Sequence, residues 1–111
     1  MNSCIFCKII TGAIPSKRVL ETNTMLVIED ITPKAQIHWL IIPKQHFDDI
    51  CAVHNGDASL FADMFAVTDQ LAQLKPETRD FRLIINRGSA AGQTVFHMHM
   101  HFLAGNALPG F

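Results

Sequence analysis

The sequence has no run of like-charged residues and no long hydrophobic segment. Nine Lys and Arg balance ten Asp and Glu, which gives a formal net charge of −1. This balance leaves no basic surface of the kind that binds duplex nucleic acid or an anionic membrane. Apolar runs such as Trp39–Ile42 are far too short to cross a bilayer, and the N-terminus does not follow the plan of a signal peptide. We therefore expect a cytoplasmic protein with neither of these partners.

Internal repeats and low-complexity tracts are also absent from the sequence. The 111 residues are 49% hydrophobic and 17% charged, a composition that favours a packed core over disorder. A chain of this length has room for one domain, residues 1–111. The three cysteines are few and odd in number, which argues against a disulfide framework. We interpret Cys4 and Cys7 as thiols available to a metal, and Cys51 as a small buried apolar residue.

Periodicity and turn residues predict an α+β fold with an antiparallel sheet of about five strands. Ser3 is the expected N-cap of a short helix over residues 4–10, which ends at Gly12. Asp57 is the expected N-cap of the one long helix, over residues 58–75, which covers the sheet. The strands are expected at residues 19–21, 25–29, 38–42, 81–86 and 94–103, with a loop at residues 30–34.

Three histidines alternate with apolar residues in the last predicted strand. Side chains of a strand alternate between its faces, so His97, His99 and His101 would stand in one row, with about 6.6 Å between successive residues. Such a row could bind a metal, or it could divide nucleophilic and acid–base work among its imidazoles. The spacing alone does not separate these two interpretations.

A loop of small and polar residues leads into this strand. Gly88, Gly92 and their small neighbours allow close backbone approach, and the polar residues of the loop supply hydrogen-bond donors that suit an oxyanion. These polar residues are Asn86, Ser89, Gln93 and Thr94. Such loops are often plain connectors. Followed at once by three histidines, this one indicates phosphoryl or nucleotidyl transfer through a covalent histidine intermediate.

A second group of candidate ligands comes from the N-terminal Cys-x-x-Cys pair and His46. Cys4 and Cys7 could give two thiolates to a tetrahedral zinc ion, which His46 and one histidine of the row would complete. The alternative is two unligated thiols and a surface histidine. His38, alone in its strand, would by itself be interpreted as a strand-end residue, and His54 as a loop residue without a role.

The sequence resembles the histidine triad family, and specifically its Hint-like branch of nucleoside phosphoramidases. The resemblance extends from residue 4 to residue 105, and its motifs occur in the order found in the family. They are Cys4–Ile10 with Ile14–Ser16, Asp30–Ala35 with His38, Ile42–His46, Asn86–Gly88 with Ala91–Thr94, and His97–Leu103.

This resemblance implies a nucleotide hydrolase or transferase that acts on the α-phosphate of purine nucleoside phosphoramidates or adenylated amines. His99 would be the nucleophile and would form a nucleotidyl-histidine, with its other ring nitrogen oriented by a backbone carbonyl. His101 and His38 would bind phosphate oxygens, His97 would support the row, and Thr94, where the family usually has Ser, would reach the leaving group. The nucleotide-binding positions implied by the resemblance are Ile5, Phe6, Ile9, Ile28, Asp30, Ile31, Leu40, Asn86, Gly92, Gln93, Thr94, His99 and His101.

The resemblance also implies a structural zinc ion bound by Cys4, Cys7, His46 and His97, no organic cofactor, and a homodimer in which the sheet continues across the axis. The chain departs from the family pattern at Ala104–Asn106, where a cation is lost, and in its tail, Leu108–Phe111. Both departures affect the segment that shapes the pocket mouth.

Three alternatives remain open from the sequence. A dinucleoside polyphosphate hydrolase of the Fhit-like branch would use the same nucleophile. A nucleotide- and zinc-binding protein with little turnover would bind without forming a covalent intermediate. A metalloenzyme with its metal on all three triad histidines is disfavoured, because no carboxylate or fourth ligand accompanies the row.

Overall fold

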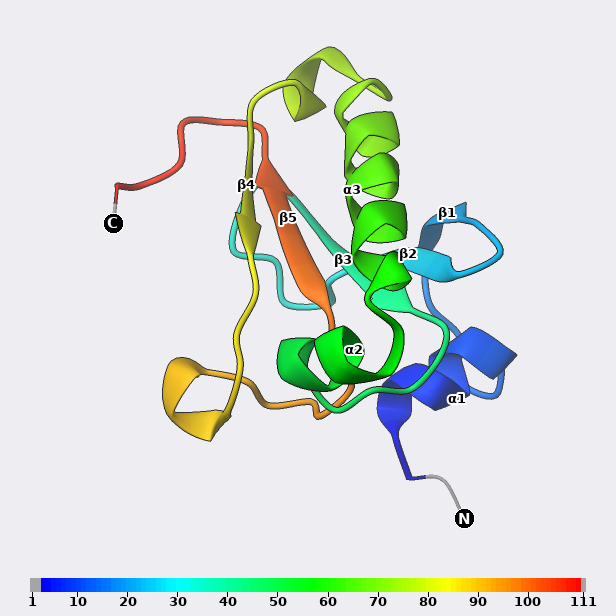
Figure 1. Cartoon of the computed structure of the whole chain (residues 1–111). Helices are drawn as coiled ribbons and strands as arrows, with labels where there is room; N and C mark the ends of the chain where they lie inside the picture. The colour runs from blue at the N-terminus through cyan, green and yellow to red at the C-terminus, as the bar shows by residue number, and fades with distance from the viewer. Residues whose placement is uncertain (1–2, 111) are drawn as a thin grey trace.

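The computed structural model describes residues 3–110 and has an α+β fold, as the sequence predicts. Met1, Asn2 and Phe111, the last residue of the divergent tail, lie outside the described residues. A five-stranded antiparallel sheet has the order β1-β2-β3-β5-β4 (Figure 1). The helices are α1 (Ile5–Thr11), α2 (Ile50–Asp57) and α3 (Ser59–Ala72), and the strands are β1 (Arg18–Glu21), β2 (Met25–Glu29), β3 (Ile37–Pro43), β4 (Phe81–Ile84) and β5 (Met100–Ala104).

The two faces of the sheet are covered by different helices. Alternate residues of the central strands, such as Trp39 and Ile41, pack with α3 in one core cluster. The intervening residues, such as Leu40 and Ile42, pack with Phe6 of α1 in a second cluster. Because strand side chains alternate between faces, β3 is buried along its whole length. His38 and Leu40 therefore lie on the face of the sheet that α1 covers.

The helices differ from the prediction at their boundaries and in number. The N-cap of α1 is Cys4, whose Sγ accepts a hydrogen bond from the backbone N–H of Cys7 at 3.4 Å, and not Ser3. Gly12 ends α1 at φ 87°, a left-handed conformation that favours glycine. The long helix is Ser59–Ala72, shorter than predicted at both ends, with Ala58 as its N-cap.

The helix α2 was not predicted. Asp49 caps it by accepting a hydrogen bond from the Ala52 N–H. Two predictions for this segment are wrong, because His54 lies in the helix and Cys51 is exposed. No helix of the described chain is both long and apolar enough to span a membrane.

The last two strands are shorter than predicted, and this affects the site. Strand β4 ends at Ile84 and lies at the edge of the sheet, where it pairs with β5 alone. Strand β5 begins only at Met100, so residues 94–99 do not belong to it. In Figure 1 the connection from β4 to β5 passes below α2 before it enters the sheet.

Candidate functional site

The three triad histidines do not form a row on one strand. His101 lies in β5 opposite Leu40 of β3, but His97 and His99 precede the strand. The backbone N–H of Met98 donates to the carbonyl of Phe47 at 2.7 Å. This contact takes the chain away from the β3 ladder, so the prediction that one strand carries all three histidines is wrong. The predicted alternation of side chains still holds. Phe6 of α1 meets the rings of His97 and His99, and the His99 ring lies 5.1 Å from that of His101, whereas Met98 and Met100 pack in the core on the α3 side.

His99 is held as a neutral imidazole with a defined hydrogen position. Its Nδ1 donates to the backbone carbonyl of His97 at 2.8 Å, which leaves the lone pair on Nε2. The Phe6 ring meets the His99 ring edge to face, with centroids 5.0 Å apart. Burial lowers the pKa of His99 below its ordinary value, and this outweighs the opposing effect of the bond to His97. The result is an unprotonated nitrogen available as a nucleophile at neutral pH.

His38 and His101 form a chain of hydrogen bonds whose direction follows from the backbone. The Lys34 N–H donates to Nδ1 of His38 at 3.0 Å, so the hydrogen of His38 is on Nε2. That Nε2 donates to Nδ1 of His101 at 2.8 Å, and the same Nε2 lies 3.4 Å from Oδ2 of Asp30. His101 therefore carries its own hydrogen on Nε2.

Burial also keeps these two histidines neutral. It lowers the pKa of His38, with Asp30 opposing the shift. The pKa of His101 falls to about 4, because burial is reinforced by the neighbouring imidazoles of His99 and His38. At neutral pH His101 is thus a neutral N–H donor.

A hollow of about 330 Å³ lies between α1 and the sheet, beside His99 and His101. Aliphatic and aromatic side chains form most of its wall. Asp30, the first residue after β2, also lines it. The structure brings together ten of the thirteen expected nucleotide-binding residues here, namely Ile5, Phe6, Ile9, Ile28, Asp30, Ile31, Leu40, Thr94, His99 and His101. Ile31, 96% exposed, is poorly covered by the rest of the chain.

Three expected residues do not line this hollow. Asn86 borders a neighbouring hollow on the other side of His101, and the exposed Gly92 lies beside the Asn86 amide. Gln93 is only 3% exposed. Its Oε1 accepts from the Gly88 N–H at 2.8 Å, and its Nε2 donates to the carbonyls of Asp48 at 2.7 Å and Val95 at 3.1 Å.

The Gln93 side chain therefore has no donor left for a phosphate. Both hydrogens of its amide are used within the protein, and the bond to Asp48 ties the loop to the segment before α2. The expectation that Gln93 binds nucleotide is not supported by this geometry, and the residue braces the loop instead.

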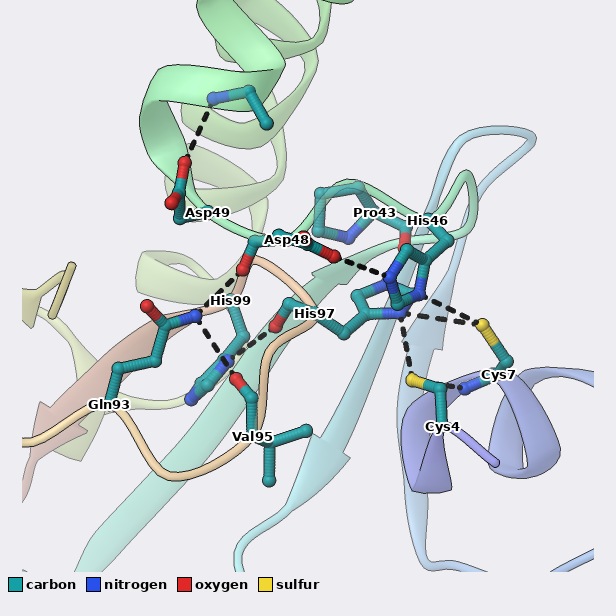
Figure 2. Close-up of polar contacts among 11 residues, drawn as sticks. Cys4, Cys7, Pro43, His46, Asp48, Asp49, Gln93, Val95, His97 and His99 are labelled. Carbon is teal, nitrogen blue, oxygen red and sulfur yellow. Dashed lines mark hydrogen bonds and ion pairs between the residues drawn. The ribbon is translucent and has the colours of Figure 1, made fainter. Parts of the chain in front are cut away.

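The two cysteines, His46 and His97 converge at the N-terminal end of α1 (Figure 2). Their four candidate ligand atoms all lie within 4.8 Å of one another. Nδ1 of His97 is 3.3 Å from Cys4 Sγ and 3.5 Å from Cys7 Sγ, and Nδ1 of His46 is 3.3 Å from Cys7 Sγ. A tetrahedral zinc ion separates its sulfur and nitrogen ligands by about 3.6 Å, close to these distances.

The second nitrogen of each imidazole in this cluster donates to an oxygen. Nε2 of His97 donates to the Pro43 carbonyl at 2.7 Å, and Nε2 of His46 donates to Asp48 Oδ1 at 3.0 Å. Both Nδ1 lone pairs therefore point toward the thiols, which is the orientation of metal-binding histidines with their outer hydrogen bonds in place. The four residues could hold a metal ion.

Charges and burial act differently on the members of this cluster. Burial raises the pKa of the Cys4 thiol and lowers the pKa of His97. Burial also lowers the pKa of His46, but its hydrogen bonds to Asp48 and Cys7 outweigh this effect and raise the net value. The thiols of such a site become ligands only as thiolates, so metal binding would release protons.

Sequence patterns did not reveal the supporting roles of three residues, Pro43 at the end of β3 and Phe47 and Asp48 between β3 and α2. Pro43 and Phe47 offer backbone carbonyls, and a carbonyl leaves no mark on the sequence because every residue has one. Asp48 could have been found, since a carboxylate two residues after a candidate metal-binding histidine can orient its ring.

Comparison with known proteins agrees with this arrangement. The sequence model of the family described as "Scavenger mRNA decapping enzyme C-term binding" matches residues 3–109. Protein HitA of Neisseria gonorrhoeae is 38% identical over 103 residues, which cover 93% of this chain and 96% of that protein. The chain belongs to the histidine triad family.

Solved structures of histidine triad proteins superpose on the whole fold. A HIT family hydrolase from Clostridium thermocellum has a TM-score of 0.93 and 37% identity, with 100% of this chain and 97% of that chain covered. A zinc-bound histidine triad family protein from Mycobacterium smegmatis has a TM-score of 0.82 and 35% identity, with 94% and 76% covered. The triad residues and the Cys–His cluster thus occur on a fold shared with these proteins.

Proposed function

We propose that this histidine triad protein is a hydrolase that cleaves the bond between the α-phosphate of a purine nucleotide and its leaving group. The preferred substrates would be nucleoside phosphoramidates or adenylated amines, and the reaction would pass through a nucleotidyl-histidine on His99. One observation carries this proposal. The hydrogen bond from Nδ1 of His99 to the His97 carbonyl leaves a nucleophilic lone pair on a half-buried imidazole beside a nucleotide-sized hollow.

The first step would be attack of the His99 Nε2 lone pair on the α-phosphorus. A P–N bond to His99 forms, the bond from phosphorus to the leaving amine breaks, and the amine departs with a proton from solvent, which the Thr94 hydroxyl can relay by giving up its own proton and taking one from water. The Nδ1–H bond to the His97 carbonyl supports the positive ring of the intermediate. Water then attacks phosphorus, the P–N bond to His99 breaks, and the nucleoside monophosphate is released with a proton to solvent.

Charge on the phosphate oxygens would be met by fixed donors. Nε2–H of His101 is the end of the hydrogen-bond chain that begins at the Lys34 backbone, so its direction is set before substrate binds. The Thr94 hydroxyl lines the same hollow, and Asn86 and Gly92 would close the phosphate end from the neighbouring loop. We assign His38 to the support of His101.

The wall of the hollow suits a base and ribose. Phe6, Ile28 and Leu40 are buried and offer an apolar surface for a purine, and Ile31 is exposed enough to cover it from the solvent side. Oδ1 of Asp30 is already occupied by the Thr32 N–H and hydroxyl, at 2.8 and 3.2 Å. A ribose hydroxyl would therefore compete with His38 for Oδ2.

A second hollow favours an amine over a polyphosphate leaving group. It has a volume of about 470 Å³ and meets the nucleotide hollow at Ile5, Thr94 and Val95. Phe96 and Ile5, 47% and 45% exposed, give it apolar walls. The described residues that line it include no Lys or Arg to balance the charge of a polyphosphate. The dinucleoside polyphosphate hydrolase remains the second candidate, because Lys34 borders the hollow on the other side of His101.

Zinc is the metal that the four-residue cluster fits best, and the zinc-bound relative from Mycobacterium smegmatis supports this. Cys4, Cys7, His46 and His97 would fill all four positions. Zinc bound there would cross-link α1 to the segments that precede α2 and β5, and would leave no open position for water.

A homodimer is the assembly we propose. Helix α3 carries Phe65, 56% exposed, beside an apolar hollow of about 260 Å³ that reaches Met100 of β5. Strand β4 is an edge strand that could pair with a second copy. Sedimentation equilibrium of wild type and Phe65→Asp tests this, and a monomeric wild type would overturn it.

The substrate comparison tests the proposed function. We would measure kcat/KM for an adenosine phosphoramidate and for a dinucleoside polyphosphate, with His99→Ala as the inactive control and His54→Gln as the active one. Faster turnover of the phosphoramidate, lost only in His99→Ala, is expected. A higher kcat/KM for the dinucleoside polyphosphate would assign the protein to the Fhit-like branch instead. Nucleotide binding without turnover of either substrate would refute the enzymatic proposal.

A further inference from the structure

His97 belongs to two sites at once. Its ring is fully buried, with Nε2 bound to the Pro43 carbonyl and Nδ1 between the two cysteine sulfurs. Its backbone carbonyl accepts the bond from Nδ1 of His99 at 2.8 Å. Figure 2 shows His97 between the cluster and His99. The residue that would bind the metal thus also supplies the oxygen that sets the tautomer of the nucleophile.

The sheet does not hold this part of the chain. Strand β5 begins at Met100, and the register with β3 ends at the pair Ile41 and Met100. The backbone around His97 is fixed instead by the His97 ring in the cluster and by the bond from the Met98 N–H to the Phe47 carbonyl. A change in the cluster would therefore move the His97 carbonyl without first breaking a strand ladder.

A second connection runs from the cluster to the loop before the triad. Nε2 of His46 donates to the Asp48 carboxylate, and the Asp48 carbonyl accepts from Nε2 of Gln93. Gln93 in turn holds Gly88 and Val95. Both imidazoles of the cluster are therefore linked to the segments that carry Thr94 and His99.

Phe6 adds a packing contact between the two sites. Its ring meets the His97 ring edge to face at 5.8 Å and the His99 ring at 5.0 Å. The helix that carries Phe6 also carries Cys7 and begins at its N-cap, Cys4. Movement of the N-terminal end of this helix would shift the wall against which His99 rests.

We infer that His97 is a positioning residue through which metal binding at Cys4, Cys7, His46 and His97 fixes the orientation of His99. Metal and nucleotide binding are then coupled, and the coupling is reciprocal. The inference rests on the proposed function, because it takes the hollow beside His99 as the nucleotide site. The inference goes beyond that function because it makes nucleotide affinity depend on the metal bound by the cluster.

The test measures the Kd of AMP by calorimetry for zinc-loaded protein and for protein stripped by a chelator. We expect AMP to bind about 5-fold to 30-fold more tightly to the loaded form, and zinc to bind more tightly by the same factor when AMP is present. The ring ¹⁵N shifts of His99 provide a spectroscopic signature. They should show one tautomer, with hydrogen on Nδ1, in the loaded protein and a mixture of tautomers after stripping.

Matched cysteine variants locate the effect. Cys7→Ser removes one ligand of the cluster and should abolish the dependence of AMP binding on zinc. Cys51→Ser removes an exposed cysteine outside the cluster and should behave as wild type. Circular dichroism checks that each form retains its fold. If the stripped protein unfolds, zinc-loaded and cadmium-loaded forms replace the pair, because cadmium's longer bonds to sulfur should shift His97 and change the Kd of AMP severalfold.

Equal AMP affinity in the compared metal states, or His99 ring shifts that do not respond to the metal, would overturn the inference and leave the proposed function intact. Absence of AMP binding in every form would overturn both. Absence of zinc binding by the folded protein would overturn the inference and the proposed zinc site, and would leave the proposed hydrolase activity intact.

Discussion

Replacement of Gln93 tests whether this side chain braces the loop or contacts the substrate. Gln93→Ala removes three hydrogen bonds, which leaves the Gly88 N–H and the Asp48 and Val95 carbonyls without their partner. Each such bond is worth about 1 kcal/mol net, so the free energy of unfolding should fall by about 3 kcal/mol. The loop that precedes Gln93 is exposed, so water can reach some of the groups that lose their partner. The loss of unfolding free energy should therefore not greatly exceed this sum.

Urea unfolding followed by circular dichroism measures this change, and an unaltered m-value would show that the unfolding transition is otherwise the same. Gln93→Glu is the matched variant. It keeps the shape and the acceptor for Gly88 but places a carboxylate oxygen against two carbonyls. Protonation of that oxygen restores one donor, so this variant should be less destabilised at pH 5 than at pH 8. A loss below about 0.5 kcal/mol for Gln93→Ala, together with weaker nucleotide binding, would refute the bracing role.

Three further predictions concern the sheet end, the triad and the second hollow. Gly105 has φ +107°, and a Cβ there would lie 2.5 Å from Gln36 Cβ, whereas Gly12, at φ +87°, has open space. Gly105→Ala should therefore lower the free energy of unfolding by about 1–3 kcal/mol, and by more than Gly12→Ala does. If urea unfolding gives the same loss for both variants, the predicted clash at Gly105 is refuted. The folded pKa of His101, about 4, lies below its unfolded value near 6.5, so the unfolded chain binds more protons between these values. The contribution of His101 to the free energy of unfolding is then complete above pH 6.5 and falls by at most about 3 kcal/mol as the pH decreases toward 4. If the free energy of unfolding of His101→Gln depends on pH as steeply as that of the wild type, this prediction is refuted. Phe96→Ala should lower kcat/KM for phosphoramidates of aromatic amines about 5-fold to 10-fold and leave kcat/KM for the unsubstituted phosphoramidate unchanged. Equal losses for both substrates would argue against a leaving-group site at Phe96.

Much of the fold was predictable because its central strands carry strong local patterns. The runs that become β2 and β3 are apolar and bounded by turn residues, and they form strands within one residue of the expected bounds. Helix α2 was missed because Asn55 and Gly56 resemble a loop. A Cβ at Gly56 would lie 2.3 Å from the Phe47 ring, so glycine is present for close packing and not to end a helix.

The residues of the site were largely found, but their geometry was not. The alternation from Phe96 to Phe102 predicted one strand, yet the strand begins only at Met100. Before that residue the Met98 N–H donates to the Phe47 carbonyl and the His97 ring donates to the Pro43 carbonyl. The acceptors are main-chain carbonyls, which no sequence pattern marks. The same is true of Gln93, whose role depends on the carbonyls of Asp48 and Val95, two residues that belong to no motif.

Detection of the covalent intermediate tests the central claim most directly. Wild-type protein and His99→Ala would be mixed with an adenosine phosphoramidate, quenched within milliseconds, digested and analysed by mass spectrometry. The account predicts one adenylyl group on the peptide that contains His99 in the wild type, formed and lost at rates that match turnover. His99→Ala should show no adduct and at least about a thousandfold lower kcat. Turnover by the wild type without an adduct, or undiminished turnover by His99→Ala, would contradict it.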